Sequence, residues 1–262
     1  MDSLADAALS AKAYAVGAWL LLFFVAERLF PADHVASADP FAPAKLHRLG
    51  RNAALFLVNF ALSPLVVVPV TAYAASVHPP WRPGWWQGVP GLALDILLLD
   101  FLTYWWHRAN HEIPFLWRFH SVHHLDATLD STSAVRFHFG EVLLSAFARA
   151  GVILLIGFSL ASVLVFETLV LVAAIFHHSI LAIPPAFEKI LSRAVITPAI
   201  HWVHHHARRI DTDSNYGTIF SFWDPLFRSR SRARREPGMA IGVEGKAEET
   251  LPDLLLHPFR PV

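Results

Sequence analysis

The sequence predicts an all-α integral-membrane protein, a helical bundle of about four to five spans with a histidine-rich helical cap on its cytoplasmic side. Three observations predict this class. The chain of 262 residues is 55% hydrophobic and only 16% charged, whereas an ordinary soluble domain has about 25% charged residues. Several apolar runs are about 20 residues long, which is the length that an α-helix needs to cross a bilayer. The chain also contains 16 histidines, and twelve of them lie between His107 and His206.

Five apolar runs are candidate spans. Their approximate bounds are 12–30, 52–76, 89–106, 141–158 and 160–182. No small-residue cleavage site follows the first run closely, so we do not expect it to be a cleaved signal peptide. Little more than GFSL separates the last two runs, which predicts a helical hairpin that ends at Pro184 and Pro185.

Basic residues near the ends of spans predict orientation, because cytoplasmic loops carry an excess of Lys and Arg. The loop at 31–51 contains three such residues, and the loop at 77–88 contains one among three tryptophans. The arginine-rich segment RSRSRARR lies at 228–235. With the N-terminus outside, these basic segments and the histidines all face the cytoplasm. Arg149, inside the fourth run, is an exception that this pattern does not explain.

The stretch at 186–195 is amphipathic if it is helical. It places Phe187, Ile190 and Leu191 on one stripe and its charged residues elsewhere. This pattern predicts either a helix that lies in the membrane interface or a helix that packs on a soluble cap, and periodicity does not decide between them.

Three histidine motifs follow the third run. HRANH lies at 107–111, and the pattern H-x-x-H-H occurs as HSVHH at 120–124 and as HWVHH at 201–205. Residues at i, i+3 and i+4 share one face of an α-helix, and the adjacent pair splays to reach two targets. The eight histidines of these motifs are His107, His111, His120, His123, His124, His201, His204 and His205. One metal ion takes about four to six ligands, so eight clustered imidazoles suit two ions.

Metal binding explains the cluster better than burial alone. Burying several imidazoles without partners costs several kcal/mol in desolvation, and coordination removes that cost. Imidazole suits Zn, Cu, Fe and Ni, so ligand type alone does not identify the metal. HRANH lacks the glutamate of the zinc motif H-E-x-x-H. We expect structural roles for the other scattered histidines, which are His34, His47, His78, His206 and His257.

The three motifs, followed by NYG at 215–217 and WDPLF at 223–227, resemble the fatty acid hydroxylase superfamily of integral-membrane sterol desaturases, sterol methyl oxidases and sphingolipid hydroxylases. The match covers roughly 93–230. The resemblance implies a non-haem di-iron oxygenase that hydroxylates or desaturates a lipid, with two iron ions as cofactor and O2 as co-substrate. Zinc would be an adventitious occupant. The expected regions are N-terminal transmembrane helices and a loop at 1–88, the catalytic domain at 89–235 and a C-terminal tail at 236–262.

Two further stretches match the family's motifs in part. RFHFGE at 136–141 is similar to R-x-H-P-x-E but lacks the proline, and HHSI at 177–180 keeps two residues of H-S-N but lacks the asparagine. The resemblance therefore adds His138 and His178 as metal ligands or as residues that support ligands. His177 is the less favoured neighbour of His178.

Polar neighbours are expected to orient each imidazole through its other ring nitrogen. Asp100 lies seven residues before His107 on the same helical face, and an aspartate inside an apolar span is a functional candidate. Asp213, Asn215 and Tyr216 follow the last motif closely enough to fold back on it. A simple turn would also explain the composition of NYG.

The expected partners are the membrane, a lipid substrate and an external electron donor of the cytochrome b5 or ferredoxin and reductase type. No cysteine is present to hold a ferredoxin cluster, and the net charge of zero gives no reason to expect nucleic acid. The segment at 228–235 would dock an acidic carrier, or it reflects topology and contact with anionic lipid. The alternatives are a metal-binding membrane protein without catalysis and a zinc lipid hydrolase, which O2 consumption would distinguish.

Overall fold

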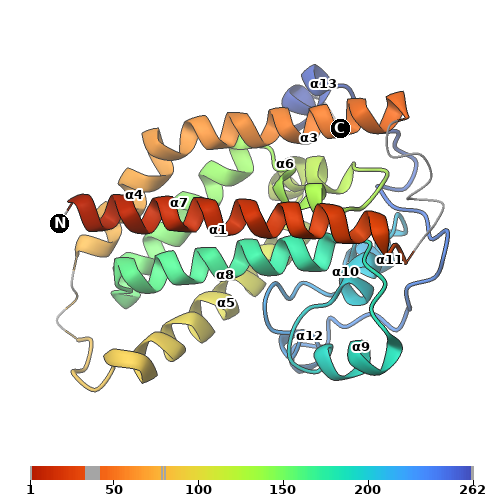
Figure 1. Ribbon diagram of the computed structural model, residues 1–262. Coiled ribbons are helices and arrows are strands. Elements are labelled where there is room, and N and C mark those ends of the chain that lie inside the picture. Colours follow the sequence, from red (N-terminus) through yellow and green to blue (C-terminus); the bar gives the residue numbers. More distant parts are fainter. Residues whose placement is uncertain (1, 33–41, 78, 80, 261–262) are drawn as a thin grey trace.

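The computed structural model describes residues 2–32, 42–77, 79 and 81–260, with the backbone alone for 2–11. Five long helical segments run side by side (Figure 1). They are α1 (Asp2–Leu29), α3 (Pro43–Leu62) continued through the π-helical turn Ser63–Val67 into α4 (Val68–Ser76), α5 (Gly88–Glu112), α7 (Phe139–Ile156) and α8 (Leu160–His178). Within the described ranges there is no β-strand, so the all-α prediction is confirmed.

Four segments among the described residues are long and apolar enough to cross a membrane, which agrees with the predicted four to five. They are Pro43–Ser76, Gly88–Glu112, Phe139–Ile156 and Leu160–His178. The first predicted run belongs to α1, which is not one of the four.

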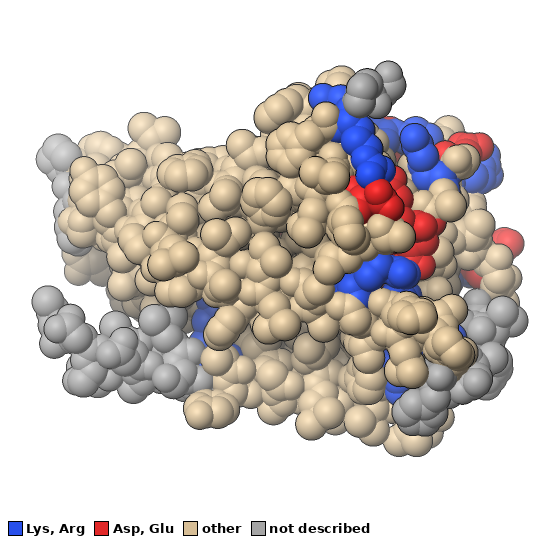
Figure 2. Space-filling model, turned by 90° about the horizontal axis from the view of Figure 1, so that it is seen from above, with Lys and Arg blue, Asp and Glu red and all other residues tan. Residues whose placement is uncertain are grey.

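Short helices gather at one end of the bundle (Figure 1). They are α6 (Pro114–His124), α9 (Pro185–Leu191), α10 (Pro198–His204), α11 (Arg209–Thr212), α12 (Trp223–Leu226) and α13 (Leu251–Leu256), with 3-10 turns at Ser131–Val135 and His257–Phe259. In Figure 2 most of the visible charged side chains lie at this same end, and little charge shows on the rest of that face. The N-terminus lies at the opposite end, as does the connection between α4 and α5. We call the end with the short helices the charged end.

The core lies between α4, α5, α7 and α8. Its buried side chains include Ala74, Leu99, Ile153, Val163 and Phe166. The tight turn between α7 and α8 was expected, but the two helices do not pair as a simple hairpin. Instead, α7 packs mainly on α4, and α8 packs on α1 and α5. The central position of α8 brings its last residue, His178, into the middle of the charged end.

At the opposite end of the bundle, the buried carboxylate of Asp95 on α5 connects the α4–α5 connection to α8. It accepts hydrogen bonds from Arg82 at 2.8 and 2.9 Å, from Trp86 at 2.8 Å and from Ser162 at 2.6 Å. Gly157 ends α7 with a positive φ of 76°, and a Cβ atom there would lie 2.5 Å from Pro79. The α4–α5 connection therefore folds closely against the start of α8.

The exception at Arg149 is explained by a charge on the neighbouring helix. Glu167 of α8 accepts from Lys12 of α1 at 2.7 Å and lies 3.2 Å from Arg149 of α7. The three side chains are largely buried, so the cluster joins three helices.

The amphipathic stretch at 186–195 forms a shorter helix than expected, because α9 ends at Leu191. Phe187 and Ile190 are both 64% exposed. No described element covers the apolar stripe, so the structure favours the membrane interface over packing on a cap.

Candidate metal centre

Four helices bring the histidines together at the charged end. The last turns of α5 contribute two histidines, and α6 contributes three. The last residue of α8 is His178, and α10 contributes His201 and His204, with His205 directly after it. The sequence predicts the first motif beyond the third span, with that span ending near 106, but α5 continues through this motif to Glu112. The spacing within each motif thus becomes a spacing within or directly after a helix.

The side chains form two groups. The five-histidine group contains His107, His111, His120, His124 and His204, and the four-histidine group contains His123, His178, His201 and His205. In each group the candidate ligand atoms all lie within 4.8 Å of one another. In both H-x-x-H-H motifs the two histidines four residues apart stay together, and the one between them turns to the other group, because i and i+4 share a helical face.

Distances in the four-histidine group suit a metal ion. The Nε2 atom of His178 lies 3.1 Å from that of His123 and 3.0 Å from that of His201, and the Nε2 atoms of His201 and His205 are 3.1 Å apart. Two imidazole nitrogens at right angles, each about 2.1 Å from a metal, are separated by about 3.0 Å. The rings are therefore spaced as neighbouring ligands of one ion.

The proton positions on these rings also suit a cation. The Nδ1 atoms of His123 and His178 lie 3.1 and 2.7 Å from the carbonyl oxygens of Arg136 and Ala174. A carbonyl only accepts hydrogen bonds, so each neutral ring has its proton on Nδ1 and a bare lone pair on Nε2. Two lone pairs 3.1 Å apart repel each other. A metal ion between them removes that repulsion.

The five-histidine group is oriented in a similar way, by carboxylates as well as carbonyls. The Nδ1 atoms of His107 and His204 donate to the carbonyl oxygens of Tyr216 and Ser214 at 2.8 and 2.6 Å. His111 lies 3.2 Å from an Asp213 carboxylate oxygen, and His120 lies 2.7 Å from a Glu141 carboxylate oxygen. Such partners fix the ring orientation and make the imidazole a stronger ligand.

Burial leaves the ligand nitrogens without partners in the protein. The Nε2 atoms of His111, His120, His124 and His204 are buried and have no hydrogen-bond partner among the described residues. Burial lowers the pKa of His204 to about 3 and holds the pKa of His124 well below its usual range, so both rings are neutral at physiological pH. Unpaired buried nitrogens are costly, and a bound metal in each group would satisfy them.

Comparison with known proteins agrees with this geometry. The sequence model described as "Fatty acid hydroxylase" matches residues 92–229, which is more than half of the chain. The chain belongs to the fatty acid hydroxylase family. The matched region holds every residue of the two histidine groups.

Three similar proteins illustrate the family. Ornithine lipid hydroxylase OlsE of Rhizobium tropici is 27% identical over 75% of this chain and 58% of its own length. A cholesterol 25-hydroxylase-like protein of Danio rerio is 30% identical over 58% of this chain and 62% of its own length. Human alkylglycerol monooxygenase is 30% identical over 56% of this chain and 31% of its own length. The matches thus span less than two thirds of each relative. No solved structure matches the chain.

Nine of the ten predicted ligands of this family member lie in the two histidine groups. All eight histidines of the motifs lie in the two groups, and His178 joins the second. His138 lies outside both, because its Nδ1 accepts from the Gly140 amide at 2.9 Å and its Nε2 lies 3.1 Å from the Leu255 carbonyl oxygen. It caps the start of α7, and we leave it out of the proposed ligand set.

The other described histidines of this family member also lie outside the two groups. His206 pairs with Asp211 at 2.9 Å, and His257 pairs with Glu249 at 2.9 Å. The His177 ring is buried, with its centroid 4.0 Å from that of His201. His47 is exposed, and the expectations for His34 and His78 fall outside the described residues.

The expected hydrogen bond between Asp100 and His107 is not formed. The Asp100 carboxylate accepts from the amides of Ile219 and Phe220, both at 3.1 Å, and from the Trp223 indole at 2.8 Å. Asp100 lies two helical turns before His107, and its carboxylate faces the loop that follows NYG. This loop supplies donors that are better placed for Asp100 than the imidazole ring of His107 is. The partner of His107 is instead the Tyr216 carbonyl.

Asn215 and Tyr216 support the rings through the main chain. Asn215 has a positive φ of 53°, which asparagine tolerates better than most residues, and its side chain bonds Ile200 and Ser231. NYG is thus both a turn and a support for the ligands. Motif reading missed the carbonyls of Ser214, Ala174 and Arg136, since a main-chain oxygen leaves no signal in residue type.

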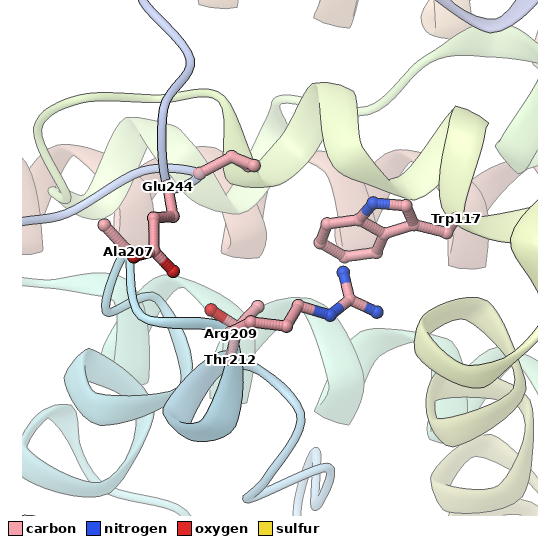
Figure 3. A pocket seen from close by; sticks show the side chains of 6 residues that line it. Trp117, Ala207, Arg209, Thr212 and Glu244 are labelled. Atoms are coloured by element: carbon pink, nitrogen blue, oxygen red, sulfur yellow. The ribbon is translucent and has the colours of Figure 1, made fainter. Parts of the chain in front are cut away.

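A pocket of about 260 Å³ opens beside the five-histidine group, lined by Trp117, Ala207, Arg209, Thr212, Val243 and Glu244 (Figure 3). The Trp117 ring centroid lies 5.0 Å from that of His111, and the Arg209 guanidinium lies 4.1 Å from the Trp117 ring. Arg209 also donates to the His111 carbonyl at 2.8 Å. One indole ring thus separates this pocket from the histidines.

Proposed function

We propose that this family member is a membrane-bound oxygenase that holds two iron ions and hydroxylates or desaturates a C–H bond of a lipid, with O2 and electrons from a separate carrier. The observation that carries this proposal is the pair of adjoining histidine groups whose bare Nε2 atoms point at one another. The names of the three relatives describe lipid hydroxylation or alkylglycerol monooxygenation, which supports a lipid as the substrate class.

The protein's own residues hold the ligands and shape their surroundings. Two bound irons would supply O2 activation and hydrogen removal from an unactivated carbon. Carbonyl partners on Nδ1 leave Nε2 free for the metal in four of the rings, which are those of His107, His123, His178 and His204. The carboxylates of Asp213 and Glu141 strengthen two further ligands of the five-histidine group. Except for His107, which is partly buried, the ligand side chains are buried and shielded from bulk water.

Metal analysis tests the two-metal site. Protein purified without metal-affinity resin should contain close to two metal ions per chain, and iron reconstitution should restore lipid oxidation. Zinc in a preparation does not identify the native metal, because zinc binds such sites more tightly than Fe(II). A clean ratio of one metal per chain would reject the paired site.

We propose that the charged end faces the cytoplasm, where an electron carrier would meet it. The basic loop at 31–51 and the arginines at 228–235 support this orientation. A reporter fused within the α4–α5 connection at position 84 should report outside, and one fused at position 262 should report inside. An external signal at 262 would contradict both the orientation and a cytoplasmic electron donor.

The substrate is best sought in the cell's own lipids. Lipid extracts from a deletion strain and its parent, grown aerobically and compared by mass spectrometry, should differ in one oxidised or unsaturated lipid class. Restoring the wild-type gene should reverse the difference, and the His204→Ala variant should not. Identical extracts would argue against lipid oxidation by this protein.

A further inference from the structure

One turn supplies the hydrogen-bond acceptors for two ligands of the five-histidine group. The carbonyl oxygens of Ser214 and Tyr216 lie 2.6 Å from His204 Nδ1 and 2.8 Å from His107 Nδ1. The two carbonyls come from opposite sides of Asn215, whose left-handed backbone turns the chain between them. The orientation of both rings therefore depends on how firmly this turn is held.

The Asp224 carboxylate holds the turn from behind. Its Oδ1 accepts from the Tyr216 amide at 2.8 Å and its Oδ2 from the Gly217 amide at 3.0 Å, while Ser229 donates to Oδ1 at 2.7 Å. Asp224 is 1% exposed. A Cβ atom on Gly217 would lie 2.7 Å from Ile196 Cδ1 and 2.9 Å from both Asp224 Oδ2 and the Phe220 carbonyl oxygen, so the glycine leaves room for the carboxylate and for these neighbours.

A second buried carboxylate extends the support. Asp100, which is fully buried on α5, accepts from the amides of Ile219 and Phe220 and from the Trp223 indole, directly before Asp224. The two aspartates thus accept from five donors between residues 216 and 224, four of them main-chain amides. Hydrogen bonds from amides to a carboxylate are among the stronger ones in proteins.

The four-histidine group has a different support. His123 donates to the Arg136 carbonyl and His178 to the Ala174 carbonyl, and neither acceptor belongs to the turn. The Arg136 side chain is anchored on the Val122 carbonyl and on Asn52, both at 3.0 Å. The rings of His123 and His178 are therefore oriented by parts of the chain other than this turn.

We propose that Asp224 is a positioning residue for the five-histidine group alone, acting through the turn that orients His107 and His204. The inference rests on the proposed two-metal site. Loss of Asp224 should weaken metal binding at that group and leave the four-histidine group intact. Loss of a residue that positions a ligand typically lowers metal affinity about 10–100-fold.

The test is a Co(II) titration of metal-free protein, followed by equilibrium dialysis and visible absorption. The wild type should bind two equivalents. Asp224→Asn keeps the shape but turns a donor towards one of the two amides, so we expect one equivalent at wild-type affinity and one weakened about 10–100-fold. The matched control is Asp95→Asn, which removes an equally buried carboxylate from α5 about 18 Å along the helix from His107. It should keep both equivalents.

Each outcome decides the inference. If Asp224→Asn binds both equivalents at wild-type affinity, or loses both to the same extent, the inference is wrong. Should that variant fail to fold, Gly217→Ala pushes a methyl group against the same carboxylate, and retention of both sites by it would also overturn the inference. A wild type that binds fewer than two equivalents rejects the two-metal site and this inference with it. Two tight sites without lipid oxidation after iron loading would instead reject the proposed activity alone.

Discussion

Replacing His204 by alanine should abolish lipid oxidation and lower the metal content, whereas replacing His206 should leave most of both. His204 is fully buried in the five-histidine group, with its Nε2 directed at the other ligands and its Nδ1 fixed by Ser214. His206 lies two residues later, about 200° around a helix, and pairs with Asp211 outside both groups. The same chemical change therefore removes a ligand in one case and a peripheral ion pair in the other.

The measurement is product formation by mass spectrometry on lipid extract, with O2 and a supplied electron donor, together with metal content. Equal damage from the two variants would show that His206 belongs to the site and that the assignment of the third motif is wrong. His206→Ala also controls for general destabilisation, because it changes the same residue type in the same segment.

Replacing Arg48 by methionine should lower the free energy of unfolding by about 3–5 kcal/mol, which is typical for breaking a buried ion pair. Arg48 on α3 is buried and donates to Asp126 at 2.5 and 2.8 Å and to Asp130 at 2.8 and 3.1 Å. Methionine removes the charge and leaves two carboxylates buried without this partner. The loop that follows α6 would lose its main tie to α3.

Equilibrium unfolding in detergent measures this effect, with Arg108→Met as the control. Arg108 forms an exposed pair with Glu112 one helical turn away at 2.8 Å, and such pairs contribute about 0.3–0.5 kcal/mol. Equal losses of stability in the two variants would mean that the Arg48 network adds no more than a surface pair.

Much of this molecule could be predicted from residue type and spacing. Apolar runs of bilayer length predicted the spanning helices, since length and composition are the main physical requirements. The repeated H-x-x-H-H pattern predicted that neighbouring histidines turn to two targets, and the rings of His123 and His124 lie in different groups. Both features depend on local helical geometry.

Features that depend on distant contacts were beyond sequence reasoning. Asp100 shares a helical face with His107, but helical phase does not show that the loop at 219–223 packs against Asp100 and supplies three donors to its carboxylate. The match of RFHFGE to a family motif suggested a metal ligand or a supporting residue at His138, and this residue caps α7 outside both histidine groups. The charges of α1 find partners on α8 and on the loop near Ser131, and no local pattern shows them.

The ratio of O2 consumed to lipid oxidised tests the central claim most directly. The purified protein is loaded with iron or with zinc and supplied with its lipid substrate and an electron donor, and both quantities are followed in a closed cell. An iron-dependent oxygenase should consume one O2 for each lipid molecule oxidised, and the zinc-loaded protein should consume none. Lipid turnover by the zinc-loaded protein, or by either form without O2, would contradict the account and favour a hydrolase.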